Sequence, residues 1–214
     1  MKRITSILLA FTFAMTVTAQ NSSSHLTFKG VPIDGTLTEF ADKLVKKGFS
    51  YPNTLPKEYE DKIRNAGWGG LLDLAKLADE ESNSNAHLEG TFAGYSSCDI
   101  FINTLWSADI VNSVVVQFPY RADWVDLIAN YTNLKEMLTE KYGAPQQCEE
   151  HIPGTKESYF DREDAFEKGT GAWFAQYNLS NGKIILYLKT SHIELHYIDA
   201  KNTSLQRSKA IDDL

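Results

Sequence analysis

The sequence has few cysteines, fewer basic than acidic residues and no glycine or heptad period, and each shortage excludes a class of protein. Only two of its 214 residues are cysteine, which excludes a small scaffold held together by many disulfides. Lys and Arg number 21 against 28 Asp and Glu, for a net charge of −7. This acidity argues against a nucleic-acid or anionic-membrane partner. The lack of a glycine or heptad period excludes a fibrous protein.

The residues that are present indicate a globular chain. Apolar residues make up 43% and aromatic residues 12% of the sequence, and a disordered chain carries far fewer aromatics. A chain of this length forms one domain of ordinary size, or two small ones, with a core that is stable without a metal or many disulfides.

The first segment has the pattern of a secretory signal peptide. Lys2 and Arg3 form a basic start, an apolar run follows to Met15, and small residues lead up to Ala19. The run is shorter than the roughly 20 apolar residues that cross a bilayer, and we expect no later segment to span one. The pattern therefore predicts that residues 1–19 are removed and that the mature protein is periplasmic or extracellular.

Both cysteines, Cys98 and Cys148, lie in the part predicted to be exported. In an oxidising compartment two cysteines form a disulfide when they lie close together. A bridge closing so long a loop would stabilise the fold by roughly 4 kcal/mol. The alternative is two separate thiols, because a free cysteine behaves as a small apolar side chain. Their spacing fits neither a C-x-x-C redox pair nor a zinc-binding set.

The first half of the chain predicts one helix followed by three strands. Thr36 and Glu39 have the spacing of a capping box, apolar residues then recur at helical spacing to Val45, and Gly48 follows the helix end. Apolar and polar residues alternate in the strands that follow. The short links between these strands predict an antiparallel meander. The three strands are predicted at 89–95, 99–104 and 112–118, with the first link at Ser96 and Ser97.

The second half repeats this order without residue-by-residue identity. One apolar stripe runs from Asp123 to Tyr142, and Gly143 follows it. Asn181 and Gly182 have the composition of a two-residue hairpin turn. Three strands are predicted here, at 172–179, 183–189 and 192–199.

Together the two halves predict an α+β fold, with two layers made of tandem helix and β-meander units that share one sheet. We expect a single domain over residues 20–200, with repeat one at about 25–120 and repeat two at about 121–200. Residues 201–214 are predicted to be a polar, frayed tail. Two long insertions remain: 50–88, with short helices predicted at 57–65 and 71–78, and 149–171, with one more strand predicted near 158–160.

The element order from Thr36 to Asp199 resembles the β-lactamase-inhibitor-protein-like topology. That topology is a tandem repeat of a helical segment and a β-meander, found in several exported bacterial proteins. No signature motif accompanies the resemblance, and the 50–88 insertion departs from the repeat. The resemblance implies that the exposed face of the sheet binds a protein.

The sequence contains none of several common local catalytic motifs. There is no nucleophile elbow, P-loop, H-E-x-x-H or dinucleotide fingerprint, and we expect no cofactor. His192, Glu194 and His196 alternate along a predicted strand and share one face. These residue types bind zinc, but residues four apart on a strand lie about 13 Å apart along it. The alternation favours the polar outer face of a half-buried strand. The other histidines, at positions 25, 87 and 151, are scattered and carry no signal.

Four further residues are weak binding candidates. Trp68 lies in a glycine-rich break and Trp106 in the link after a predicted strand, while Tyr120 and Arg121 follow the third strand. Exposed aromatic side chains in loops anchor protein partners or stack on sugars. Loop tryptophans also fold back over the edge of a core.

These observations leave two classes of function. The first is an exported, non-catalytic binding module that recognises a protein or a cell-surface polymer. The second is an envelope hydrolase or metal-dependent enzyme whose site is assembled from distant residues, with His192, Glu194 and His196 as its best feature. The lack of a visible polar constellation favours the binding module.

The leader generates the first testable prediction. Mass spectrometry of the protein secreted by the cells that produce it is expected to find an N-terminus at Gln20, or within a residue or two of it, because the signal-peptide pattern ends at Ala19. An intact Met1 in the mature protein would contradict export by this leader.

Overall fold

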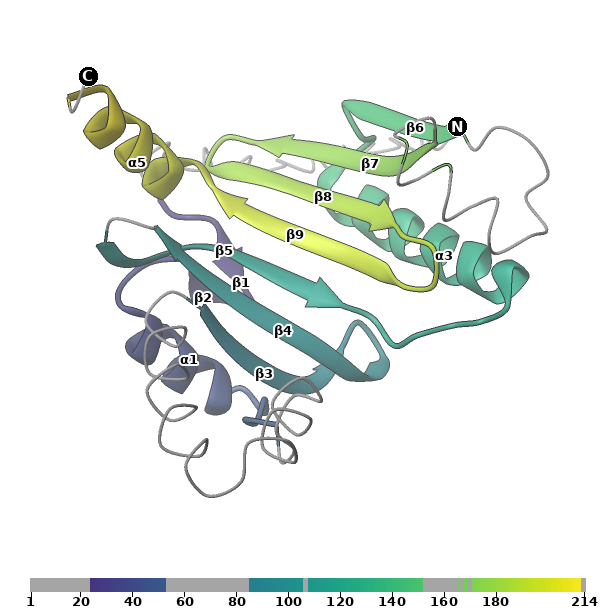
Figure 1. Cartoon of the computed structure of the whole chain (residues 1–214), viewed down its shortest axis with the longest axis horizontal. Helices are drawn as coiled ribbons and strands as arrows, with labels where there is room; N and C mark the ends of the chain where they lie inside the picture. The colour runs from purple at the N-terminus through teal and green to yellow at the C-terminus, as the bar shows by residue number, and fades with distance from the viewer. Residues whose placement is uncertain are drawn as a thin grey trace, which may run out of the picture.

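Seven antiparallel strands form one continuous sheet in the order β3-β4-β5-β9-β8-β7-β6, and two helices lie along one of its faces (Figure 1). The computed structural model describes residues 24–52, 85–105, 108–151, 165, 168 and 171–212. The strands of the sheet are β3 (Asn85–Phe92), β4 (Tyr95–Leu105), β5 (Ala108–Gln117), β6 (Gln147–His151), β7 (Ala172–Leu179), β8 (Gly182–Leu188) and β9 (Ile193–Asp199). A small hairpin joins β1 (Thr27–Phe28) to β2 (Val31–Pro32), and the described helices are α1 (Leu37–Val45), α3 (Trp124–Tyr142) and α5 (Ala200–Asp212).

The sheet joins the two predicted units edge to edge. The first unit contributes the meander β3-β4-β5, the second contributes β6 to β9, and β5 pairs with β9 at the junction. The α+β fold predicted from the sequence is therefore confirmed. The second unit has one strand more than expected, because β6 precedes its meander and pairs with β7. Every side chain of β6 is exposed, so no apolar alternation marks this strand in the sequence.

Both helices of the covered face begin at a capping side chain, of which the Thr36 and Glu39 capping box was predicted. In α1 the backbone N–H of Glu39 donates to Thr36 Oγ1 at 3.3 Å, and the N–H of Thr36 donates to Glu39 Oε2 at 3.4 Å. This reciprocal pair satisfies two N–H groups that have no partner within the helix. In α3 the carboxylate of Asp123 accepts from two backbone N–H groups, and Gly143, with φ +83°, ends the helix.

A single row of side chains crosses the sheet beneath these helices. In order across the sheet it contains Leu88, Ile100, Val116, Leu195, Leu186, Ala175 and Cys148. The first six are buried and Cys148, at the β6 edge, is exposed. Phe40 and Leu44 of α1 and Tyr131 and Leu134 of α3 are buried in the same core cluster. The core is thus continuous from one edge strand almost to the other.

The turn of the first meander differs from the predicted one. Ala93 and Gly94 connect β3 to β4, both with positive φ, at 50° and 85°. The prediction extended the first strand through these residues to Tyr95 and placed the turn at Ser96 and Ser97. Positive φ at both central residues is the geometry of a type I′ hairpin turn, in which alanine is uncommon. For this reason the composition of the turn did not reveal it.

The predicted hairpin between β7 and β8 is present, but its turn lies one residue earlier than expected. Leu179 pairs with Gly182, so the two turn residues are Ser180 and Asn181. Gly182 begins β8, and a β-carbon there would collide with the backbone carbonyl of Ile198. Glycine is therefore needed at this position for close approach of two strands rather than for the turn.

A Cys98–Cys148 disulfide, one of the two alternatives that the sequence left open, is not present. Both cysteines are free, with Cys98 buried and Cys148 exposed. Cys98 lies on β4 and Cys148 on β6, five strand positions away. That separation is roughly 24 Å at the usual strand spacing, whereas the α-carbons of a disulfide lie less than about 7 Å apart. Of the two alternatives that the sequence left open, the structure therefore shows two separate thiols.

The segment after β9 is a helix where a frayed tail was expected. Asp199 precedes α5, and its carboxylate Oδ1 accepts from the backbone N–H of Asn202 at 2.8 Å. Its other oxygen accepts from the backbone N–H of Leu26 at 2.7 Å, and His25 Nδ1 lies 3.2 Å from Oδ1. Asn202 then donates through Nδ2 to the carbonyls of Ile33 and Val111. These contacts join α5 to the N-terminal segment and to β5.

Several other expectations fall outside the described residues. They are the leader at 1–19, the helices at 57–65 and 71–78, and the strand near 158–160.

The buried carboxylate of Asp199 generates the second prediction. Asp199 is 0% exposed, and the substitution Asp199→Ala would leave buried N–H groups of Leu26 and Asn202 without an acceptor. Because each such group costs about 1–3 kcal/mol, we expect the free energy of unfolding in urea to fall by roughly 3 kcal/mol. The matched control, Asp42→Ala, removes an exposed carboxylate of α1, and we expect it to cost less than about 0.5 kcal/mol. Equal losses for the two variants would contradict the structural role of Asp199.

Candidate functional site

The sheet has a second face, opposite α1 and α3, over which no described helix lies (Figure 1). We call this surface the open face and define it by two cross-strand rows. The first row, from β3 to β7, contains Glu89, Asp99, Gln117, Glu194, Tyr187 and Phe174. The second row contains His87, Phe101, Val115, His196, Ile185 and Gln176. Ile185 is buried and the other side chains are half-buried.

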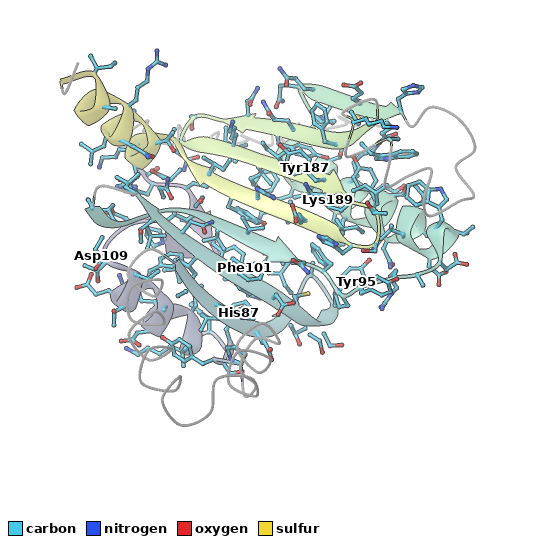
Figure 2. All side chains as sticks on the ribbon, viewed as in Figure 1. His87, Tyr95, Phe101, Asp109, Tyr187 and Lys189 are labelled. Carbon is cyan, nitrogen blue, oxygen red and sulfur yellow. The ribbon has the colours of Figure 1, made fainter. Side chains whose placement is uncertain are left out.

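Aromatic rings and cationic or imidazole groups contact one another on the open face. The ring of Phe101 stacks on His87, with centroids 4.8 Å apart and an interplanar angle of 16°. Farther along the face, the rings of Tyr187 on β8 and His196 on β9 meet edge-on, with centroids 5.0 Å apart. Lys189 Nζ lies 4.9 Å from the centroid of the Tyr187 ring. Figure 2 shows His87 on β3, Phe101 on β4 and Tyr187 on β8, with Lys189 just after the end of β8. The open face can therefore offer both apolar contact and hydrogen-bonding groups to a partner.

The central charged group of the open face is Glu194 of β9. Its Oε1 accepts from His192 Nε2 at 3.2 Å and its Oε2 from His196 Nε2 at 3.0 Å. Lys189 Nζ lies 3.3 Å from Oε2. The hydrogen bonds from His192 and His196 hold the pKa of the Glu194 carboxyl well below its ordinary value, against the opposing effect of burial. Glu194 thus joins the two histidines that the sequence places too far apart to share an ion.

A second charged group lies near the β3 edge. His87 and Glu89 of β3 project from the open face, and Asp99 of β4 is paired directly opposite Glu89. His87 Nε2 lies 2.8 Å from Asp99 Oδ1. One donor atom from each of the three residues lies within 4.8 Å of the other two, and this is the one such group of His, Cys, Asp or Glu among the described residues.

The backbone at Glu89 is held from both sides. Ser50 forms an antiparallel bridge to Glu89, with N–H to carbonyl distances of 2.9 and 2.7 Å. A β-carbon at Gly90 would collide with the ring of Phe49, so glycine allows the segment after α1 to lie against β3. The edge strand is therefore covered at this point, and Glu89 is fixed opposite Asp99.

This second group was not predicted from the sequence. His87 carried no signal there, because the predicted first strand began only at Glu89 and its turn was placed at Ser96 and Ser97 rather than at Ala93 and Gly94. With that turn in place, two-residue alternation puts His87 and Glu89 on one face, and the hairpin register brings Asp99 opposite Glu89. The signal was therefore present, but it depended on a turn of unusual composition.

The weak binding candidates are not brought together into one site. Trp68 and Trp106 lie outside the described residues. Tyr120 is 62% exposed, and Arg121 Nη1 donates to the carbonyl of Tyr120 at 3.0 Å. The backbone N–H of Arg121 donates to the carbonyl of Ser191 at 2.8 Å. This contact places Tyr120 and Arg121 beside the turn that leads to His192, at the end of the open face.

Comparison of the chain with protein-family models, with curated proteins and with solved structures found no match in any of the three. Among the described residues, no helix is long and apolar enough to cross a membrane.

The lowered pKa of Glu194 generates the third prediction. An ionised, hydrogen-bonded Glu194 stabilises the folded state above its ordinary pKa of about 4.5, and that contribution is lost as the pH falls below this value toward the folded-state pKa. Urea unfolding at pH 6 is therefore expected to show Glu194→Gln to be less stable by about 1–2 kcal/mol. We expect the difference to shrink steadily as the pH is lowered below about 4.5.

Glu136→Gln, which removes an exposed carboxylate of α3, is the matched control and should show little difference at either pH. A stability loss for Glu194→Gln that grows on acidification would contradict the assigned role.

Proposed function

We propose that this chain is an exported, non-catalytic binding module whose open face recognises a protein. The observation that carries the proposal is a wide sheet face, without a helix over it in the described structure, that combines half-buried aromatic rings with imidazole and carboxylate groups. Stacked and edge-on contacts fix several of these side chains before any partner binds. Preorganised side chains lose less conformational entropy on binding, which favours affinity.

The dimensions of the open face suit a protein partner. The six strands of the open face span about 24 Å across the sheet and seven residues span about 23 Å along a strand, which gives a surface of roughly 550 Å². A stable protein interface buries about 800 Å² on each partner. A small molecule is normally held in a concave pocket that covers most of its surface, and a broad sheet face of this kind fits a macromolecule better.

The chemical character of the open face supports the same partner. Phe101 of β4 and Tyr187 of β8 lie on opposite sides of the β5–β9 junction, each on the strand next to that pair. Interface centres are enriched in aromatic residues, and a few such residues carry most of the binding energy. Lys189 and the half-exposed histidines around them provide hydrogen-bond donors that a partner's carbonyl or carboxylate oxygens can accept.

Two further parts of the proposal rest on the sequence. Export rests on the basic and apolar pattern of residues 1–19. Resemblance to the β-lactamase-inhibitor-protein-like topology rests on the order helix then meander, which occurs twice, and it implies protein binding by the exposed sheet face. The order of elements in the structure is compatible with this resemblance.

The fourth prediction tests the binding face directly. A photo-crosslinking amino acid is placed at Phe101 on the open face or at Val125 on α3, which is 74% exposed. Each protein is then produced in the cells that make it and irradiated. We expect a protein partner to be crosslinked from position 101 and not from position 125.

With the partner purified, the variant Phe101→Ala/Tyr187→Ala is expected to bind at least tenfold more weakly, a loss of about 1.4 kcal/mol or more. Met137→Ala, a change on the exposed side of α3, should leave the affinity unchanged. Unfolding midpoints of all variants exclude a loss of folding as the cause. Equal crosslinking from both positions, unchanged affinity of the double variant, or a crosslinked polysaccharide in place of a protein would overturn the proposal.

A further inference from the structure

The group formed by His87, Glu89 and Asp99 brings three potential metal ligands to one point of the sheet. The three donor atoms lie within 4.8 Å of one another and come from two neighbouring strands. In a tetrahedral zinc site the donor atoms are about 3.4 Å apart, given metal–ligand distances near 2.1 Å. Small side-chain movements are therefore enough to bring all three donors onto one ion.

The charges of this group favour a cation. Glu89 and Asp99 lie directly opposite each other on adjacent strands, and like charges in such a pair destabilise a sheet. Among the described residues, no lysine or arginine forms an ion pair with either carboxylate, and His87 is the partner of Asp99. A divalent ion between the two carboxylates would replace their repulsion with attraction.

The contrast with Glu194 on the same face is informative. Glu194 already has His192, His196 and Lys189 as partners, and a metal there would have to displace them. At the β3 edge a metal displaces one hydrogen bond, between His87 and Asp99. The ring of His87 is held by its stacking on Phe101, and the backbone of Glu89 is bridged to Ser50.

We propose that His87, Glu89 and Asp99 form a binding site for a divalent transition metal of the zinc class. One imidazole with two carboxylates suits Zn²⁺, whereas Ca²⁺ and Mg²⁺ prefer ligand sets made only of oxygen. Three protein ligands leave a fourth position for water or for a donor group of another molecule. The site does not depend on the open face binding a protein.

Zinc titration of the purified protein, freed of metal with a chelator, tests the proposal. Isothermal titration calorimetry with Zn²⁺ alone is expected to show one ion bound per chain. We expect His87→Ala to weaken binding at least tenfold. The matched control is His196→Ala, which removes another half-buried histidine of the open face outside the group and is expected to bind zinc as the unmodified protein does.

Glu89→Gln separates metal binding from a structural role of the group. Because this change relieves the repulsion of the like-charged pair, the stability of the metal-free variant is expected to be unchanged or higher. The rise in unfolding temperature that zinc gives the unmodified protein should be largely lost, because a ligand stabilises a fold according to its affinity. A fall in metal-free stability with an intact zinc response would show a structural role only and would overturn the proposal.

Two results of the calorimetry would also overturn it. One is no zinc binding at millimolar concentration. The other is binding that survives His87→Ala but is lost in His196→Ala, which would place the ion at Glu194. Neither result bears on whether the open face binds a protein, which the crosslinking experiment decides separately.

Discussion

The fold depends on one buried carboxylate, Asp199, at the end of β9. It is 0% exposed and accepts hydrogen bonds from the backbone of Leu26 and Asn202, with His25 beside it. Burying a carboxylate without partners costs several kcal/mol, so these hydrogen bonds are needed to offset the burial of Asp199. Through Asn202, which donates to the carbonyl of Val111, the same network reaches β5. The two halves of the sheet are therefore joined by backbone pairing of β5 with β9 and by a polar network at one end of that pair.

This junction determines which surfaces the molecule offers. Since the two meanders share one sheet, α1 and α3 lie on the same face and bury a common core (Figure 1). The opposite face is then a single continuous surface, to which both halves contribute. Had the halves folded as separate domains, Asp99 of β4 and Glu194 of β9 would not belong to one cross-strand row. The extent of the open face is thus a consequence of the junction.

The elements that local sequence encodes were predictable, and those that distant contacts determine were not. The capping box at Thr36 and the glycine at 143 mark helix ends through interactions within a few residues. By contrast, α5 has little apolar periodicity, and its first turn is fixed by Asp199 and by Asn202, whose partners lie far away in the sequence. β6 has only exposed side chains and is recognisable through its pairing with β7. The sequence could not decide between a disulfide and two separate thiols for the same reason, because the distance between Cys98 and Cys148 follows from strand order, which spacing along the chain does not reveal.

The candidate site shows the same division. Alternation along one strand predicted that His192, Glu194 and His196 share a face, and the structure adds that Glu194 is hydrogen-bonded to both histidines. By contrast, Glu89 and Asp99 are brought opposite each other only by the register of the β3–β4 hairpin, which alternation along a single strand does not reveal. A carboxylate whose charge is balanced by neighbours within the chain stabilises the folded state, as Glu194 does at the centre of the sheet. Glu89 and Asp99 are opposed carboxylates, and among the described residues only His87 forms an ion pair with either of them, so their repulsion is less fully offset. The proposed cation would remove this repulsion and stabilise the folded chain.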